Sequence, residues 1–182
     1  MPRVPYKSRA ELSAEGQAVY DRIAATRGAV GHVFQALLNS PGAAGALAGL
    51  GEYLRYSSPL DPAVRETAIL SAAREMGNQY EWAHHEPVAR RVGVRDEVIE
   101  SIRAGRAPMG LPAKEGVFAQ AAKELVRTGT LTERTFQAVL HLLGPHNTVE
   151  LVVLVGYYSM VGRAIAALGV GLEEGMEPGL PG

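Results

Sequence analysis

Residues that start and stop helices recur along the whole chain, and this punctuation constrains the fold more strongly than any other feature of the sequence. Ser13, Ser40 and Asp61 stand directly before apolar segments, where their side chains can accept hydrogen bonds from the first backbone N–H groups of a helix. Gly28 and Gly93 follow such segments and can adopt the left-handed conformation that ends a helix. The alternation of apolar and polar residues that is typical of strands does not persist. We therefore predict an all-α protein.

The predicted helices belong to one domain. A length of 182 residues suits a single core, which we place within residues 1–168. Residues 1–10 form a proline-rich extended arm, and residues 169–182 form a tail of glycine and proline that we expect to be mobile or to lie over a partner. A loop is expected over residues 106–112. The helices themselves are predicted at residues 13–23, 33–38, 43–56, 61–76, 79–91, 96–104, 114–128, 132–143 and 147–168.

A weak internal similarity relates residues 65–70 to residues 149–154, since both place a Glu in the first turns of an apolar helix. It is consistent with a duplicated helical hairpin. The second copy would carry Ile165 and Gly169 at the positions of Glu81 and His85 in the first, which leaves any site in one half only. Two buried helices that merely look alike explain the pattern equally well.

The composition excludes several classes of function. A formal charge of −1 with a sequence pI of about 6.5 offers no surplus of cations for a phosphate backbone, so we expect no nucleic-acid partner. The chain has no cysteine, which removes disulfides and every mechanism that uses a protein thiol. Its longest apolar stretch, residues 151–158, is too short to span a bilayer, and residues 1–9 lack the apolar run of a signal peptide. We expect a cytoplasmic protein without a membrane partner.

Residues 80–86 (Tyr-Glu-Trp-Ala-His-His-Glu) hold more reactive side chains than any other segment. On a helix Glu81 and His85 are one turn apart, so the carboxylate can orient the imidazole as a general acid or base. Glu66 lies on the preceding predicted helix and would face the same cleft if the two helices form a hairpin, with Arg74 as a cation on that side. A solvated helix face with the same residues is about equally consistent with the spacing alone.

The same region resembles the carboxymuconolactone decarboxylase family of the alkylhydroperoxidase-D-like superfamily. The specific part consists of residues 65–70, residues 73–74, residues 80–87 and the turn at residues 91–94, and a looser likeness covers residues 60–103 and the helix at 147–163. The resemblance implies an alkylhydroperoxidase-D-like helical bundle that assembles into trimers or hexamers. It also implies a small-molecule substrate and a site near a subunit contact.

The resemblance further separates two branches of that superfamily. The peroxidase branch carries two cysteines between a Glu and a His, and the same spacing counted from Glu66 reaches Asn78, Glu81 and His85. Both cysteines are replaced, which removes the dithiol that reduces peroxides in that branch. The chain instead looks like the decarboxylase branch, whose reaction converts 4-carboxymuconolactone to an enol-lactone with loss of carbon dioxide.

By this resemblance we assign roles to the candidate residues. His85 would be the proton donor, Glu81 its orienting partner, and Glu66 a second acid-base or site-shaping carboxylate. The residues assigned to substrate binding are His84, Arg74, Tyr80 and Trp82, although the only tryptophan of the chain is also a natural core residue. No cofactor and no metal is implied.

Two other classes of function stay open. Glu81 and His84 match half of the Glu-x-x-His pattern that helical bundles use for two metal ions, but neither Glu66 nor Glu150 has a His three residues later. A single-metal site of Glu66, Glu81 and His85 is the remaining metal hypothesis. Alternatively, the same three residues form a buried hydrogen-bond network in a non-catalytic homo-oligomer that binds a small anionic or apolar ligand. Convergence on an open pocket would favour chemistry, and a closed contact would favour the network.

Overall fold

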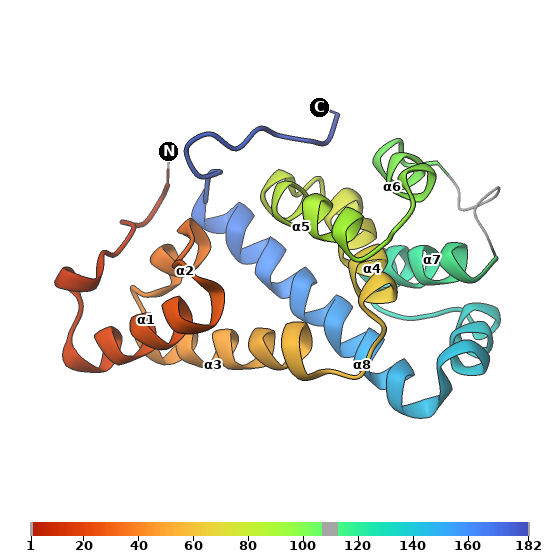
Figure 1. The fold of residues 1–182 in the computed structure, drawn as a ribbon, viewed down its shortest axis with the longest axis horizontal. Helices are drawn as coiled ribbons and strands as arrows, with labels where there is room; N and C mark the ends of the chain where they lie inside the picture. Colours follow the sequence, from red (N-terminus) through yellow and green to blue (C-terminus); the bar gives the residue numbers. More distant parts are fainter. Residues whose placement is uncertain (1, 107–112, 182) are drawn as a thin grey trace. The chain divides into compact units, whose positions relative to one another are not determined.

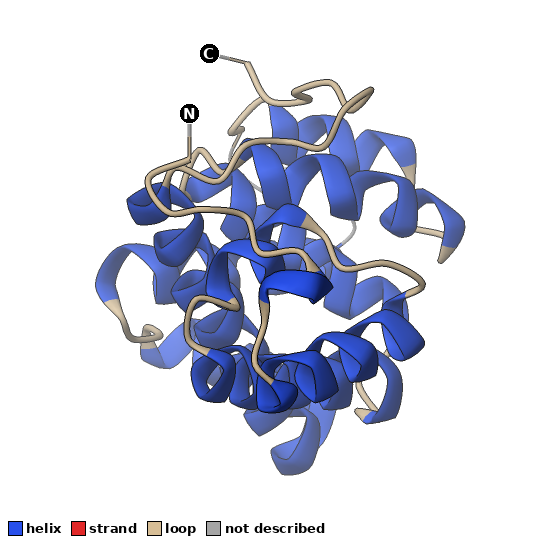
Figure 2. Cartoon of the chain, turned by 90° about the vertical axis from the view of Figure 1, so that its left-hand side faces the viewer, coloured by secondary structure: helices blue, strands red, loops and turns tan. Residues whose placement is uncertain are grey.

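The computed structural model describes residues 2–106 and 113–181, and over these residues it contains helices, turns and loops but no strand (Figure 2). The all-α prediction is therefore confirmed. The contacts divide the chain into two compact units, one formed by Met1–Ser58 with Ala164–Met176 and the other by Pro59–Arg163 with Glu177–Gly182. The predicted loop at 106–112 lies, except for Arg106, outside the described residues.

The first unit is built around three helices, α1 (Ala14–Arg27), α2 (His32–Leu37) and α3 (Pro41–Glu52) (Figure 1). Two short helical segments, η1 (Arg9–Glu11) and the π-helical η2 (Tyr53–Ser57), flank them. The predicted start of α1 is confirmed, because the Ser13 side chain accepts a hydrogen bond from the Gly16 N–H. α1 also ends as predicted at Gly28, whose φ of 80° is readily available only to glycine.

The second unit is organised around α4 (Pro62–Glu75), which contacts the helices α5 (Gln79–Arg91), α6 (Asp96–Arg103) and α7 (Ala113–Thr128) (Figure 1). Every residue from Glu66 to Ala73 on α4 is buried. A helix that is buried on all sides has no solvated face on which to place polar groups. Its polar side chains must therefore find partners within the protein.

The junction between α4 and α5 follows the predicted signals. Asp61 accepts hydrogen bonds from the N–H groups of Ala63 and Val64 at the start of α4. At the end of α4 Gly77 adopts a φ of 62°, and the chain reverses there. The Asn78 side chain then accepts a hydrogen bond from the Glu81 N–H and so caps α5. These caps fix where the polar residues of both helices lie.

The last helix, α8 (Glu133–Leu168), is divided by Gly144, whose φ of 71° and ψ of 171° are not helical. The division agrees with the separate helices predicted at 132–143 and 147–168. The segment that resembles residues 65–70 thus lies within one uninterrupted helix, whereas the first copy spans α4 and α5. α8 is long and apolar enough to cross a membrane by length and composition, but half of its most apolar stretch is buried, as in the core helix of a soluble protein.

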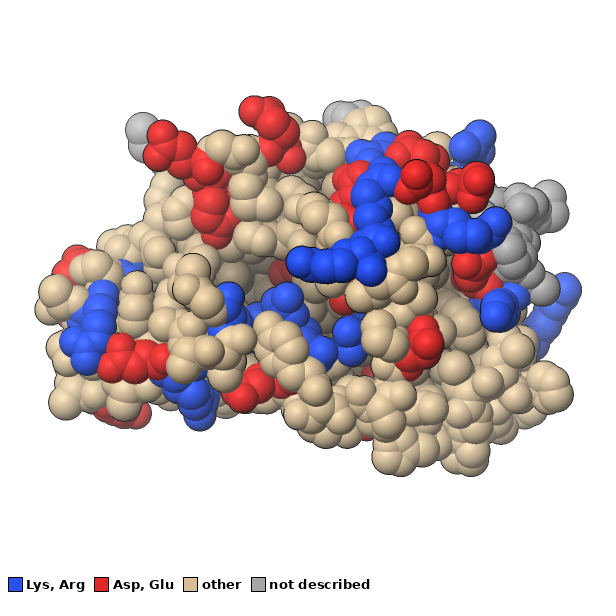
Figure 3. All heavy atoms as spheres, viewed as in Figure 1, with Lys and Arg blue, Asp and Glu red and all other residues tan. Residues whose placement is uncertain are grey.

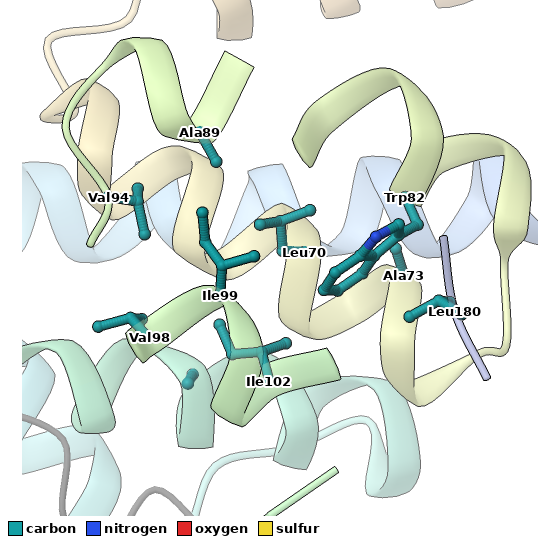
Figure 4. Packing of buried hydrophobic residues seen from close by; sticks show 10 residues of the cluster. Leu70, Ala73, Trp82, Ala89, Val94, Val98, Ile99, Ile102 and Leu180 are labelled. Carbon is teal, nitrogen blue, oxygen red and sulfur yellow. The ribbon is translucent and has the colours of Figure 1, made fainter. Parts of the chain in front are cut away.

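The tail differs from its expected mobility, because part of it is packed on the second unit. Gln79 and Leu180 exchange two hydrogen bonds of 2.9 Å between the Gln79 side-chain amide and the Leu180 backbone. Leu180 is only 7% exposed and lies in the same apolar cluster as Trp82 and Ala73 (Figure 4). A side chain built on Gly179 would come within 2.6 Å of the Trp82 ring. One apolar residue among the glycines and prolines is thus enough to anchor the chain end.

We predict that Leu180→Ala lowers the free energy of unfolding by about 2 kcal/mol, because it removes apolar contacts from the Trp82 cluster. Urea unfolding followed by the fluorescence of Trp82, the only tryptophan, measures this loss. Glu177→Ala changes an exposed residue of the same tail and should leave the midpoint unchanged. Equal midpoints for Leu180→Ala and the unmodified chain would mean that the tail does not contribute to this cluster in solution.

Candidate active site

His85 lies between two carboxylates on neighbouring helices. Its Nδ1 is 2.7 Å from Oε2 of Glu66 on α4, and its Nε2 is 3.5 Å from Oε2 of Glu81 on α5. The exposed fractions are 2% for Glu66, 3% for His85 and 6% for Glu81. The structure therefore brings together the three residues that the sequence assigned to catalysis.

The local sequence explains this arrangement. Glu81 and His85 share a face of α5 because they are separated by one helical turn. Glu66 lies near the start of the buried α4, and the reversal at Gly77 folds α5 back against α4. The short distance identifies Glu66 as the closer partner of the imidazole. We expected Glu81 to orient the ring, and the geometry instead gives Glu66 the contact best suited to that task.

The two distances constrain where protons lie. At 2.7 Å the contact with Glu66 is a full hydrogen bond, which places a proton on Nδ1 because a carboxylate can only accept. The contact between Nε2 and Glu81 is favourable only if a further proton lies between them, carried either by the carboxyl or by the imidazolium. At 3.5 Å this second contact is longer than an ordinary hydrogen bond. The pair thus holds a proton that is less firmly bound than the one facing Glu66.

Two further residues surround the cluster and were not singled out from the sequence. Nε of Arg65 lies 3.4 Å from Oε1 of Glu66, and the Arg65 side chain is 12% exposed. Cationic and anionic groups therefore alternate from Arg65 to Glu81. The ring of Tyr158 on α8 stands edge to face with His85, with ring centroids 5.0 Å apart. Neither contact has a signal in the sequence, because both depend on how side chains pack.

Asn78 adds a hydrogen-bond donor to the same face of α5. Its Oδ1 must face the Glu81 N–H, because only the oxygen can accept that hydrogen bond. Nδ2 is consequently the other end of the amide; it is buried and has no partner among the described residues. A side chain on Gly162 would come within 2.9 Å of Nδ2, so glycine is required on the facing part of α8. Spacing placed Asn78 at a former cysteine position but gave it no role.

The residues assigned to substrate binding are distributed over different surroundings. The ring of Tyr80 packs against that of His84, with centroids 4.5 Å apart. Trp82 is fully buried in the apolar cluster, and its Nε1 donates a hydrogen bond of 2.8 Å to Glu86. Trp82 therefore packs the helices of this unit, as expected for a core residue.

Arg74 belongs to another part of the second unit. Its Nε donates a hydrogen bond of 2.7 Å to the carbonyl oxygen of Arg103 at the end of α6. It also lines a small cavity together with residues of α6 and α7, and none of Glu66, Glu81 and His85 lines that cavity. The structure thus separates Arg74 from the cluster that the sequence grouped with it. The separation arises because Arg74 lies eight residues beyond Glu66, at the other end of α4.

Within residues 2–106 and 113–181 no group of three or more His, Cys, Asp or Glu side chains is arranged to hold a metal ion. The hypothesis of a single metal held by Glu66, Glu81 and His85 gains no support from this geometry. The contact of 2.7 Å between His85 and Glu66 already uses the lone pair that one ligand would need.

Glu86 anchors the outer side of α5. Burial alone would raise the pKa of its carboxyl, but hydrogen bonds from Arg90, Trp82 and Arg103 outweigh this effect and lower the pKa from its ordinary 4.5. The guanidinium of Arg103 also lies 5.0 Å from the centre of the Trp82 ring and contacts the carbonyl of Gly179. This group of charges joins α5, α6 and the tail.

We predict that Glu86→Gln destabilises the fold by about 1–2 kcal/mol at pH 7 and that the difference vanishes at low pH. Because the pKa of Glu86 is lowered by folding, its carboxylate stabilises the fold above pH 4.5 and loses this effect as the pH falls below that value. Urea unfolding between pH 3 and pH 7 measures both curves, with Glu174→Gln as an exposed control. Parallel curves for the two variants would contradict this assignment.

Solved structures share this fold over nearly the whole chain. An uncharacterized peroxidase-related protein from Ralstonia eutropha JMP134, described as an alkylhydroperoxidase AhpD core, aligns with a TM-score of 0.77 and 16% identity over 95% of this chain and 93% of that one. A peroxidase-related protein from Silicibacter sp. TM1040 aligns with a TM-score of 0.73 and 18% identity over 94% and 90%. A cysteine-to-alanine variant of the debrominase Bmp8 in complex with 2,3,4-tribromopyrrole gives 0.71 and 14% over 94% and 91%. The class of fold is therefore alkylhydroperoxidase-D-like.

The family follows from the sequence itself. Residues 41–124, which include Glu66, Glu81 and His85, match the model of the "Carboxymuconolactone decarboxylase family". The chain is a member of this family within the alkylhydroperoxidase-D-like superfamily, and it lacks cysteine. A search of curated proteins found no match.

Proposed function

We propose that the protein is a carboxymuconolactone decarboxylase-like lyase that removes carbon dioxide from a carboxylated lactone by acid-base chemistry. The observation that supports this proposal is the imidazole of His85 with Nδ1 held by Glu66 and Nε2 next to Glu81. Such an arrangement fixes the ring while leaving one proton available for transfer. Thiol chemistry has no place in the proposal, because the chain has no cysteine.

The reaction requires an acid and a stabiliser for a developing oxyanion. When carbon dioxide leaves, the electron pair of the broken carbon–carbon bond flows into the conjugated lactone carbonyl and forms an enolate. The proton shared by His85 and Glu81 is then delivered to a ring carbon, and Nε2 or the Glu81 carboxylate is left deprotonated. The unpartnered Nδ2 of Asn78 can donate to the enolate oxygen near the N-terminus of α5.

The same proposal includes the setting of the enzyme. We expect a cytoplasmic protein that needs no cofactor, acts on a small molecule and binds neither nucleic acid nor membrane. On the face shown in Figure 3 acidic and basic side chains are interspersed, which suits a protein without a polyanionic partner. We also expect a trimer or hexamer, since α8 exposes the apolar side chains of Val149, Val153 and Met160.

A second candidate function is a non-catalytic network in a ligand-binding oligomer. The near-complete burial of Glu66, Glu81 and His85 favours it, because their contacts can hold α4 against α5 without any reaction. The two candidates differ in what His85→Ala changes. A network predicts a loss of stability of about 3–5 kcal/mol in this variant and no turnover by the unmodified chain.

We predict that the purified protein converts 4-carboxymuconolactone with release of carbon dioxide and that His85→Ala lowers kcat by about 10²–10⁴-fold. Loss of the lactone absorbance and trapped carbon dioxide measure the two products of the step. His141→Ala, which changes an exposed histidine, should retain full activity. The proposal fails if a folded, unmodified protein leaves the lactone intact.

We further predict that Glu66→Gln and Glu81→Gln affect turnover differently. Glu66→Gln should lower kcat by about 10–100-fold with little change in KM, because the ring loses the charged partner that orients it. Glu81→Gln should instead alter the pH dependence of kcat, because it removes one of the two groups that share the proton. Glu97→Gln serves as an exposed control. Identical pH profiles for Glu81→Gln and the unmodified protein would contradict the shared proton.

A further inference from the structure

A second group of polar side chains surrounds the small cavity that contains Arg74. The cavity has a volume of about 40 Å³ and lies where the C-terminal ends of α4 and α6 meet the middle of α7. Arg74, Arg106 and Lys123 bring three cations to its lining, and Ser71 adds a buried hydroxyl. Ile102 and Ala119 provide an apolar wall. Glu66, Glu81 and His85 are not among the lining residues.

The cations of this cavity lack anionic partners. Arg74 uses Nε for the Arg103 carbonyl, and no carboxylate within the described residues pairs with Arg74, Arg106 or Lys123. Glu75, the acidic residue in the lining, is already ion-paired with Arg127. Three cations gathered around one space without compensating charge repel each other. An anion between them would remove this repulsion.

Gly105 keeps the guanidinium of Arg74 accessible. It follows α6 with a φ of 64°, and a side chain at this position would come within 3.1 Å of Nη2 of Arg74. The Nη groups lie on the side of the guanidinium opposite to its backbone contact and can form a bidentate contact with an oxyanion. Glycine thus serves both the turn and the opening.

We propose that this cavity binds a phosphate-class oxyanion, either free or as the phosphate group of a small molecule. Its volume corresponds to roughly three water molecules, which is the size of a tetrahedral oxyanion rather than of an apolar ligand. Three cations match a dianion better than a monocarboxylate. The proposal is independent of the decarboxylase function, because it involves none of the residues of the acid-base cluster.

Isothermal titration of the full-length protein with inorganic phosphate at fixed ionic strength tests the site. We expect saturable binding of one phosphate per chain, much weaker binding of acetate, and at least tenfold weaker phosphate binding in Lys123→Gln. Lys114→Gln changes an exposed lysine on the same helix and should bind like the unmodified protein. Arg106→Gln provides a second variant that leaves the contact between Arg74 and Arg103 in place.

Three results would overturn the proposal: no saturable phosphate binding, equal affinity for acetate, or equal phosphate affinity in Lys123→Gln and Lys114→Gln. A methyl phosphate arm separates the two sources of the ligand, because a site for a phosphate group on a small molecule accepts the monoester whereas a closed site for free phosphate rejects it. Turnover of 4-carboxymuconolactone is measured separately and has no bearing on these results.

Discussion

The hydrogen bond between Glu66 on α4 and His85 on α5 is the interaction on which the candidate site depends. It joins two helices whose contact surfaces are otherwise apolar, at a distance of 2.7 Å and with almost no exposure to solvent. Polar groups buried this deeply are costly unless they are paired, so each residue requires the other. The caps at Asp61 and Asn78 set the two helices in the register that makes this pairing geometrically possible.

The same interaction gives His85 an asymmetric environment. Nδ1 is committed to Glu66, whereas Nε2 has the longer contact with Glu81. A histidine held on one side and loosely paired on the other has the geometry of an oriented acid or base. In this family member the carboxylate of Glu81 stands where the peroxidase branch has a cysteine by the spacing of the sequence, so proton transfer replaces thiol chemistry in our proposal.

Sequence patterns predicted the parts of the structure that are determined locally. Ser13, Asp61 and the turn at Gly77 and Asn78 placed the helices correctly, and helical spacing placed Glu81 next to His85. The patterns could not show that Glu66 is the closer partner, that Tyr158 packs on the imidazole, or that Arg74 belongs to a separate cavity. These features depend on how far each side chain lies along its helix and on which neighbour it meets. The packing of Leu180 on Trp82 was missed because glycine and proline dominate the tail.

The measurement that tests this account most directly is ¹⁵N NMR of the His85 imidazole in the unmodified protein and in Glu66→Gln. The account predicts that Nδ1 of His85 carries a proton hydrogen-bonded to Glu66 and that this preference weakens in the variant, while Nε2 exchanges its proton with Glu81. A neutral ring with its proton fixed on Nε2 and an unprotonated Nδ1, unchanged by Glu66→Gln, would contradict it.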